Sequence, residues 1–384
     1  MNVYVRELVS ALAQAGVRST VYVRRWQDDL PEVVEVEPGF RVVHVPAGPA
    51  DLVKEKLPQV VDEYTDWVGE HLRDEADTDA IHANYWLSGL AGHRLKHELS
   101  LPLVSTFHTL ARVKAETGDP EPARRIDAET QVIGCSDAIL ASCQAEVEQL
   151  VSLYGADRDR VEIVPPGVDH AFFSPGDRRG ARQALGHLDL GDHPVLLFVG
   201  RIQPLKGVDV AVRALAELSA AHPDAVLVIV GGASGQDGPA EQIRVRHLVA
   251  ELGLADRVRF VDPQPHHLLS TYYRAADVCL VPSRSESFGL VALEAGACGT
   301  PVVAADVGGL TTLVDDGRTG FLVDSRDPAV YALALTKVLD DPAAAAVMGR
   351  AAAARAGHYT WSTTAARLRR LYGDLTARSL VECT

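Results

Sequence analysis

Several features that identify particular classes of protein are missing from this sequence of 384 residues. Its longest apolar stretches, around Val195–Val199 and Ala225–Val230, fall far short of the ~20 residues that a membrane span needs. No basic segment followed by apolar and small residues opens the chain, so we expect a cytoplasmic protein. A formal net charge of −15 argues against a nucleic-acid partner, because a phosphate backbone requires a basic face. A small anionic ligand is still compatible with this charge, since a few Lys and Arg side chains can line one cleft.

Cysteine is scarce as well. The chain has five cysteines, none of them in a CxxC pair: Cys135, Cys143, Cys279, Cys298 and Cys383. Three of them sit among apolar neighbours, which is typical of buried thiols in a reducing compartment. We therefore expect free cysteines.

Length and composition indicate two folded domains, because 384 residues exceed one ordinary domain and 47% hydrophobic content is normal for a globular protein. Apolar runs of strand length alternate with helix-length segments, which predicts parallel sheets covered by helices on both faces. The first series of expected strands is Val42–Val45, Ala80–His82, Leu103–Phe107, Ala138–Ala141 and Val161–Val164. The second series is Val195–Val199, Val226–Val230, Val258–Val261, Val278–Val281 and Val302–Ala304.

The turn-rich stretch Pro165–His193 separates the two series and predicts a domain boundary. We expect Rossmann-like domains over residues 1–170 and 171–360, and a last helix within residues 361–384 that crosses back to the first domain. The predicted fold is therefore α/β, with two doubly wound domains that face one another across a cleft.

The beginning of the first domain departs from this pattern. Residues 1–15 predict an amphipathic helix whose apolar face includes Val5, Leu8, Val9 and Leu12. A doubly wound domain usually begins with a strand and a glycine-rich turn before its first helix. We therefore expect the first domain to lack its first strand.

The strongest functional signal is Ser-Glu-Ser-Phe-Gly-Leu-Val-Ala-Leu-Glu, residues 285–294. It follows the expected strand Val278–Val281, and such sheets bind ligands at the carboxyl ends of strands and at the helix N-termini that follow. Glu286 in the loop and Glu294 about two turns up the next helix can hold two ends of one ligand. Glu286 then suits a donor sugar and Glu294 a ribose diol. The alternative is that both are solvated or helix-capping charges.

A second signal, Gly-Arg-Ile-Gln-Pro-Leu-Lys-Gly at residues 200–207, follows the expected strand Val195–Val199. Arg201 offers a planar fork and Lys206 a point charge, which together suit a diphosphate near a helix N-terminus. The alternative is a turn with solvated cations. The glycine loop of residues 231–235 suits close approach of a ligand, although glycines after a strand often form only a turn.

Candidate functional residues in the first half of the chain give weaker signals. His108 and Thr109 end one expected strand, and Tyr85 lies just past another. Lys54 and Arg124 are cations in a loop or at a helix start. Taken singly, each of these residues fits a surface or packing role better than a functional one.

Together these segments resemble a known family. The strings GRIQPLKG, SESFGLVALEAGACGTPVVA, VGGL and DDGRTGFLV are similar to those of the family 4 retaining glycosyltransferases, which have the two-domain GT-B fold. The resemblance covers essentially the whole chain. The strings HANYWLSG, FHTLARVK and EPARRI narrow it to the group that glycosylates D-inositol 3-phosphate in mycothiol synthesis, with the sucrose-phosphate synthases as close relatives.

The resemblance implies a role for each matching residue. A nucleotide-sugar donor, UDP-linked by preference with GDP and ADP left open, would be bound by Arg201, Lys206, Gln264, Glu286, Ser287, Phe288, Gly289 and Glu294. Within this set Arg201 and Lys206 would hold the diphosphate, and Gln264 would touch the base. The acceptor phosphate would be bound by Lys54, Tyr85, Thr109 and Arg124. His108 would lie beside the reacting sugar, and the catalytic set would be His108, Arg201, Lys206 and Glu286.

The implied reaction moves a hexosyl or N-acetylhexosaminyl group to a hydroxyl of a small phosphorylated acceptor, and it requires no cofactor. Because no enzymic nucleophile stands out, we expect a front-face transfer in which the cations stabilise the leaving diphosphate. The triplets Asp77–Asp79 and Asp157–Asp159 match the Asp-x-Asp metal motif, but both precede strands and are expected to be solvated. The group that the sequence resembles also has a magnesium position, at most structural, which is matched here by Tyr273, Arg274, Ala276 and Thr300.

Other functions fit the sequence less well or stay open beside this one. A nicotinamide dehydrogenase needs GxGxxG directly after a first strand, and no such string stands there. A glycoside hydrolase needs two carboxylates that flank one bond, which the helical place of Glu294 does not favour. A nucleotide-sugar-binding protein with impaired catalysis and a sucrose-phosphate-synthase-like transferase stay open. A homodimer is compatible with the sequence.

In the family that the sequence resembles, a strand and a loop ending in two glycines come just before the first helix. We therefore expect that the sequence beginning at Met1 lacks this segment through a misplaced start codon. Its loss would uncover apolar sheet edges and remove backbone N–H groups that approach the donor phosphates. The chain as given is expected to be poorly soluble and weakly active.

Overall fold

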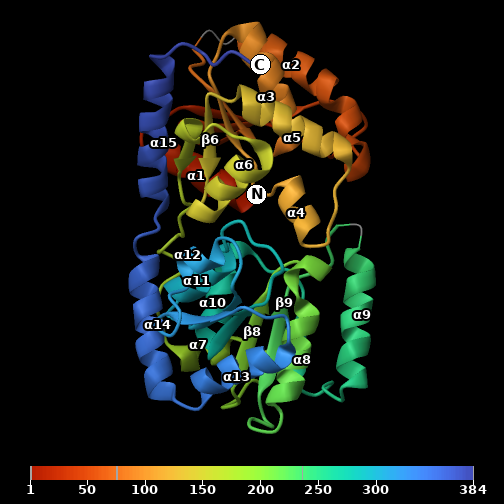
Figure 1. Cartoon of the computed structure of the whole chain (residues 1–384), viewed down its shortest axis with the longest axis vertical. Helices are drawn as coiled ribbons and strands as arrows, with labels where there is room; N and C mark the ends of the chain where they lie inside the picture. Colours follow the sequence, from red (N-terminus) through yellow and green to blue (C-terminus); the bar gives the residue numbers. More distant parts are fainter. Residues whose placement is uncertain (1, 75–76, 236, 384) are drawn as a thin grey trace. The chain divides into compact units, whose positions relative to one another are not determined.

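The computed structural model of the chain describes residues 2–74, 77–235 and 237–383 (Figure 1). The chain divides into two compact units, of which unit 1 comprises Met1–Gly167 with Trp361–Thr384 and unit 2 comprises Val168–Thr360. The first division lies near the expected boundary at residue 170, and the last helix belongs to unit 1. In the described part of the chain, no helix has the length and apolar character needed to cross a membrane.

The strands of unit 1 form two sheets. One has the order β4-β5-β6-β7 and is wholly parallel, and its strands are β4 (Ile81–Asn84), β5 (Leu103–Thr106), β6 (Ala138–Ala141) and β7 (Val161–Ile163). The other has the order β1-β3-β2, with strands β1 (Ser19–Arg24), β2 (Val33–Glu37) and β3 (Phe40–Val45). In this second sheet β1 runs parallel to β3, whereas β2 runs antiparallel to it. The first element among the described residues is helix α1 (Asn2–Gln14).

Nine helical segments surround these sheets among the described residues. They are α1 (Asn2–Gln14), the short 3-10 segments η1 (Lys54–Val60) and η2 (Arg158–Arg160), α2 (Val61–Asp74), α3 (Trp86–Leu99), α4 (Ala111–Glu116), α5 (Ala123–Cys135), α6 (Gln144–Tyr154) and α15 (Trp361–Thr376). Helices α1 and α15 pack together, and the buried side chains of Tyr4, Leu8 and Leu368 join the cluster over β5 and β6. The two ends of the chain are therefore packed into one core, as the red and blue ribbons of Figure 1 show.

Unit 2 contains one parallel sheet of six strands in the order β10-β9-β8-β11-β12-β13. The strands are β8 (Val195–Val199), β9 (Val226–Val230), β10 (Val258–Val261), β11 (Val278–Val281), β12 (Val302–Ala305) and β13 (Gly320–Val323). The chain winds outward from β8 through β9 to β10, and then returns to the other side of β8 with β11. Strands β8 and β11 therefore flank the point where the winding direction reverses, and open α/β sheets bind ligands at such a point.

The helices of unit 2 cover both faces of this sheet. They are α7 (Arg178–Ala184), η3 (Gly186–Leu188), η4 (Pro204–Lys206), α8 (Val208–Leu218), α9 (Gly238–Glu251), η5 (His266–Leu268), α10 (Leu269–Ala275), α11 (Leu290–Ala297), α12 (Leu310–Leu313), α13 (Pro328–Leu339) and α14 (Pro342–Ala356). One core cluster lies between α8, α13 and the sheet, where Leu215, Leu335 and Val303 are fully buried. The prediction of two Rossmann-like α/β domains is confirmed.

Three strands were not expected from the sequence. Strand β1 is only half-buried along its whole length, and β2 exposes Val33, Glu35 and Val36. Strand β13 has four residues and begins with Gly320. These strands lie at sheet edges in the described chain, where side chains do not need to be continuously apolar, so they gave no strong apolar run to recognise.

The cysteines are only partly as expected. Cys143, Cys279 and Cys298 are buried free thiols. Cys135 and Cys383, in contrast, form a disulfide across a sequence separation of 248 residues. The spacing of cysteines in the sequence does not indicate a pair so far apart, because only the folding of the C-terminal segment onto α5 brings the two together.

Candidate active site

The loops after β8 and β11 meet at the reversal point of the sheet in unit 2. Lys206, the last residue of η4, donates from Nζ to Oε2 of Glu286 at 2.6 Å. Ser283 donates to the same oxygen at 3.3 Å. The side chains of Lys206 and Glu286 are each 19% exposed, so both can still reach a ligand. Arg201 is exposed in the same loop as Lys206. The structure thus brings together one charged side chain from each expected motif, Lys206 and Glu286.

The backbone of residues 285–289 is held in place by the VGGL segment. The N–H of Gly309 donates to the carbonyl of Glu286 at 3.0 Å. Gly308 has φ of +49°, and a Cβ there would lie 2.0 Å from the carbonyl oxygen of Glu286. Only glycine permits this approach, so the VGGL segment fixes where Glu286 points.

The glycine loop after β9 packs against the Arg201 loop. A Cβ on Gly231 would lie 1.8 Å from the carbonyl oxygen of Gly200, and Gln203 donates to the carbonyl of Ser234 at 2.7 Å. The glycines were expected to permit approach of a ligand. In the structure Gly231 permits approach of the neighbouring backbone, and this contact supports the loop that carries Arg201 and Lys206.

Glu294 is buried on α11 and both of its oxygens have protein partners. Tyr273 donates from its hydroxyl to Oε2 at 2.8 Å, and His266 Nε2 lies 2.7 Å from Oε1. Burial and the nearby Glu294 carboxylate raise the pKa of Tyr273 well above its usual value, so the hydroxyl stays a donor. These contacts orient the carboxylate.

The remaining donor candidates lie in two neighbouring segments. Gln264 is half-buried and donates to the carbonyl of Asp262 at 2.9 Å. His266 follows two residues later in the same segment after β10 and contacts Glu294. Ser287 is half-buried, whereas Phe288 and Gly289 are buried before α11. Sequence reasoning missed His266. Its position after the carboxyl end of a strand was the one available signal.

The residues matched to a magnesium position do not fit one well. The hydroxyl of Thr300 donates to the carbonyl of Tyr273 at 2.7 Å, and the N–H of Ala276 approaches the same carbonyl at 3.2 Å. Arg274 uses its guanidinium on the carbonyls of Phe172 and Ser174. This set supplies no carboxylate, which is the side-chain ligand that Mg²⁺ usually takes.

The two Asp-x-Asp triplets lie in loops before strands. Asp157 caps η2 by accepting from the N–H of Asp159 at 3.1 Å, and this turn leads into β7. Asp77 lies before β4, with its side chain 81% exposed and 3.5 Å from Arg18. Both positions precede a strand, whereas ligands bind beyond the carboxyl ends.

In unit 1, the strands β4 and β5 end in residues with unusual backbone conformations. Tyr85 has φ of +81° directly after β4, and His108 has φ of +62° two residues after β5. Such conformations cost of order 1–3 kcal/mol for non-glycine residues and cluster at functional sites. The only other described non-glycine residues with positive φ, Ser100 and Asp189, end helical segments, where this conformation is common.

His108 is held as a neutral imidazole. Its Nε2 lies 2.9 Å from Oδ1 of Asn84, and its ring packs edge-on against Tyr4 with centroids 4.8 Å apart. Burial, with His82 nearby, lowers the pKa of His108 to about 3. The imidazole therefore offers a hydrogen bond without a charge at neutral pH.

Tyr85 and Thr109 are joined by a residue that sequence reasoning did not select. Arg125 is buried on α5 and donates to the carbonyl and the hydroxyl of Thr109 at 2.9 and 3.0 Å. Its guanidinium also lies over the ring of Tyr85, 5.0 Å from the centroid. Glu129 accepts from Arg125 Nε at 2.7 Å. The family resemblance points instead to the neighbouring Arg124, and the string EPARRI alone does not tell a buried arginine from an exposed one.

Lys54 and Arg124 form an outer, exposed pair of cations. Arg124 donates to the carbonyl of Glu55 at 3.2 Å, next to Lys54 at the start of η1. Neither cation is neutralised by a carboxylate in the ion pairs of the described residues, in contrast to Arg125. The expected acceptor residues thus form two pairs. Tyr85 and Thr109 are connected by Arg125, whereas Lys54 and Arg124 lie exposed beside η1.

Comparison with known proteins adds to this geometry. Residues 1–172 match the family described as Glycosyltransferase Family 4, and residues 186–355 match Glycosyl transferases group 1. The chain is 47% identical to a D-inositol 3-phosphate glycosyltransferase of Acidothermus cellulolyticus, covering 100% of this chain and 87% of the relative. It is 47% identical to the enzyme of the same name from Nocardia farcinica, covering 97% and 84%.

Solved structures show the same architecture. A sucrose-phosphate synthase from Thermosynechococcus elongatus matches with a TM-score of 0.90 and 34% identity, covering 98% of this chain and 93% of that one. HepE of Anabaena, solved with UDP and glucose, matches with a TM-score of 0.74 and 22% identity, covering 88% and 86%.

Proposed function

This chain belongs to glycosyltransferase family 4, and we propose that it transfers a hexosyl or N-acetylhexosaminyl group from a UDP-linked donor to D-inositol 3-phosphate. The observation that carries the proposal is the Lys206–Glu286 pair at the reversal point of the unit 2 sheet. The relatives named for inositol-phosphate transfer support the acceptor.

The charges of unit 2 suit a diphosphate and a sugar. Arg201 and Lys206 provide two positive groups for the donor diphosphate, while Glu286 accepts from sugar hydroxyls and orients Lys206. When the glycosidic bond breaks, negative charge develops on the leaving diphosphate, and preorganised cations stabilise that charge. A diphosphate oxygen then takes the proton of the acceptor hydroxyl, so that the transfer proceeds on one face with retention.

The charges of unit 1 suit a phosphorylated acceptor. Lys54 and Arg124 are free of carboxylate partners among the described ion pairs and can meet a phosphate. Tyr85 and Thr109 add two hydroxyls. Arg125 is already paired with glutamates and acts as a positioning residue that holds these two hydroxyl-bearing side chains.

A second acceptor has specific support. The sucrose-phosphate synthase matches this fold with a TM-score of 0.90, which favours fructose 6-phosphate as the alternative. Initial rates with radiolabelled UDP-sugars should be compared for D-inositol 3-phosphate, fructose 6-phosphate and unphosphorylated inositol. We expect transfer to D-inositol 3-phosphate. Preference for a neutral acceptor would refute the assignment, and donor binding without transfer to any acceptor would favour a catalytically impaired protein.

A further inference from the structure

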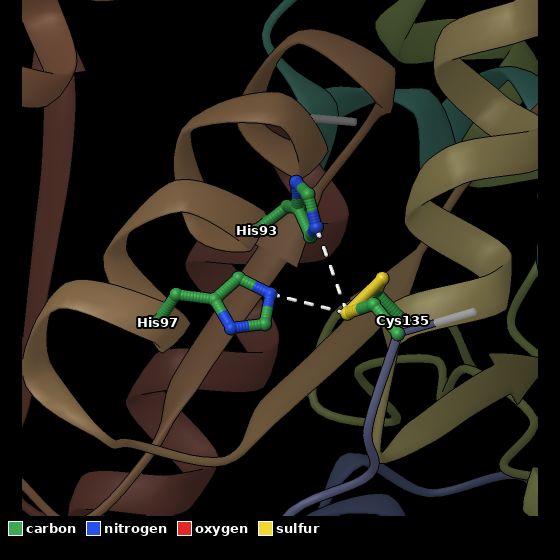
Figure 2. Close-up of side chains that lie close together, drawn as sticks. His93, His97 and Cys135 are labelled. Atoms are coloured by element: carbon green, nitrogen blue, oxygen red, sulfur yellow. Dashed lines mark hydrogen bonds between the residues drawn. A yellow bond between two sulfur atoms is a disulfide. The ribbon is translucent and has the colours of Figure 1, made fainter.

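Two histidines and two cysteines meet in unit 1, away from the residues assigned to substrate binding. His93 and His97 lie one turn apart on α3, Cys135 is the last residue of α5, and Cys383 belongs to the segment after α15. Figure 2 shows both imidazole rings directed toward the sulfur atoms, which form a disulfide. The four candidate ligand atoms all lie within 4.8 Å of one another.

The distances are close to those of a tetrahedral metal site. His97 Nε2 lies 3.1 Å from Sγ of Cys383, and His93 Nε2 lies 3.7 Å from the same sulfur. With Zn–N bonds of about 2.0–2.1 Å and Zn–S bonds of about 2.3 Å, the ligand atoms around a tetrahedral zinc ion lie roughly 3.3–3.8 Å apart. The two sulfur atoms, bonded in the disulfide, must move apart to about 3.8 Å once the disulfide is reduced, which rotation of the two cysteine side chains can provide.

The backbone around the cluster is held together independently of the disulfide. Lys96 is buried on α3 and donates to the carbonyl of Cys135 at 2.7 Å and to Asp137 at 2.9 Å. The other oxygen of Asp137 accepts from the N–H of Val381 at 2.7 Å. One buried ion pair thus ties α3, the end of α5 and the C-terminal segment together. Cys383 therefore stays near the other three ligands after reduction.

The ligand set also selects the metal. Two imidazoles and two thiolates in a tetrahedral arrangement favour zinc and disfavour the oxygen-preferring ions Mg²⁺ and Ca²⁺. The side-chain amide of Gln131 lies 3.5 Å from Nδ1 of His93, which leaves Nε2 directed at the sulfur atoms. A partner on the second ring nitrogen is the usual way in which a metal-binding histidine is oriented.

We propose that the reduced chain binds one Zn²⁺ ion through His93, His97, Cys135 and Cys383. A phosphine, oxidised to its oxide with water as the oxygen source, delivers two electrons to the disulfide, so the S–S bond breaks and two thiols form. On binding, each thiol releases its proton to solvent and donates an electron pair to the ion, and the histidines bind as neutral imidazoles. Protein atoms fill all four positions, so the site is structural. The ion fastens the C-terminal segment to α3 and α5, as the disulfide does in the oxidised chain.

The test uses the full chain, reduced with a phosphine under anaerobic conditions, treated with a chelator and exchanged into metal-free buffer. Titration with Co²⁺ should give the spectrum of a tetrahedral thiolate site at one equivalent, and Zn²⁺ should displace the cobalt. Bound Zn²⁺ should also protect Cys135 and Cys383 from alkylation, as read by mass spectrometry. The His93→Ala/His97→Ala variant should lose at least about 100-fold in zinc affinity, more than the loss of an outer partner causes.

Cys143→Ala is the matched control, because Cys143 is a buried free cysteine of the same unit, and it should bind zinc as the original chain does. Folding is checked on the oxidised proteins, where the double histidine variant should melt within a few degrees of the original chain. If it does not fold, His97→Gln, at an exposed position, takes its place. Equal zinc affinity in the original chain and the histidine variant would overturn the proposal, as would a reduced chain that gives no tetrahedral cobalt spectrum.

Discussion

Replacement of Lys206 by alanine tests the proposed donor site most directly. Lys206 Nζ lies 2.6 Å from Oε2 of Glu286, and both side chains are 19% exposed. The ammonium group is proposed to face the leaving diphosphate, so its loss removes stabilisation of a charge that develops only as the bond breaks. Loss of one such group lowers kcat by about 10²–10³, equivalent to about 2.7–4 kcal/mol of activation free energy.

The same substitution should affect folding much less. Water reaches both side chains, and Ser283 still donates to Glu286 at 3.3 Å when the lysine is gone. Partly solvated ion pairs contribute about 0–1 kcal/mol to the free energy of unfolding. For a domain of this size, 1 kcal/mol corresponds to about 2–4 °C in Tm. A large loss of turnover with a small shift in Tm is therefore the expected signature.

The assay measures initial rates of transfer from a radiolabelled UDP-sugar at saturating D-inositol 3-phosphate, with Tm from calorimetry. Lys206→Arg keeps the charge but changes its geometry, and we expect an intermediate rate. Lys337→Ala is the matched control, because it removes an ammonium on α13 that lies over the ring of Phe321 in β13, and it should leave the rate unchanged. Turnover of Lys206→Ala within about tenfold of the original chain, well short of the loss that one stabilising group causes, would refute the donor-site reasoning.

The remaining predictions concern the acceptor, pH and Glu294. Arg124→Ala should raise KM for D-inositol 3-phosphate at least tenfold, because a charge-assisted contact of about 1.5–3 kcal/mol is lost. Donor binding, measured by calorimetry, should stay unchanged. An unchanged KM would contradict the phosphate assignment. Burial lowers the pKa of His82 to about 4 and that of His108 to about 3. The unfolded chain therefore takes up these protons near pH 6.5 and the folded chain only near pH 3–4, so stability should fall as pH decreases through this window. Each histidine contributes about 1.4 kcal/mol per pH unit to the slope of the free energy of unfolding against pH. His108→Gln should remove the contribution of one histidine, as measured by urea unfolding at several pH values. An unaltered slope would argue against the buried neutral state. Tyr273→Phe should lower the free energy of unfolding by about 1–3 kcal/mol, since Glu294 loses a buried donor, and should raise KM for the donor; a stability equal to that of the original chain would show that the bond is dispensable.

The sequence placed Lys206 and Glu286 in two loops that each follow a strand of one parallel sheet. The carboxyl ends of such strands lie at the same edge of the sheet. Strand order alone therefore brings residues 80 positions apart close to one another. The sequence likewise placed Tyr85 and His108 each just past a strand, and the structure shows that these strands, β4 and β5, are neighbours.

Sequence reasoning did not extend to contacts that depend on burial or on distant packing. Arg124 and Arg125 are adjacent and identical in the sequence, and only the packing of α5 buries Arg125 against Glu129. The pairing of His266 with Glu294 requires α11 to lie beside the segment after β10, and strand order alone does not give that distance. Short half-exposed strands such as β1 carry too little apolar pattern to be recognised.

The division of unit 1 into two sheets bears on how this unit opens. Strand β1 is hydrogen-bonded only to β3, and β4 only to β5, so no backbone ladder connects the two sheets in the described part of the chain. Loss of the β1-β3-β2 sheet would leave the ladder from β4 to β7 unbroken. Proteins exchange their amide hydrogens in such cooperative units, each with its own opening free energy. The amides of β3 should therefore exchange with solvent as one group and those of β5 as another. Strand β5 is wholly buried, whereas the neighbours of β3 are half-buried or exposed, so the β5 group, beside which Tyr85 and His108 lie, should exchange more slowly.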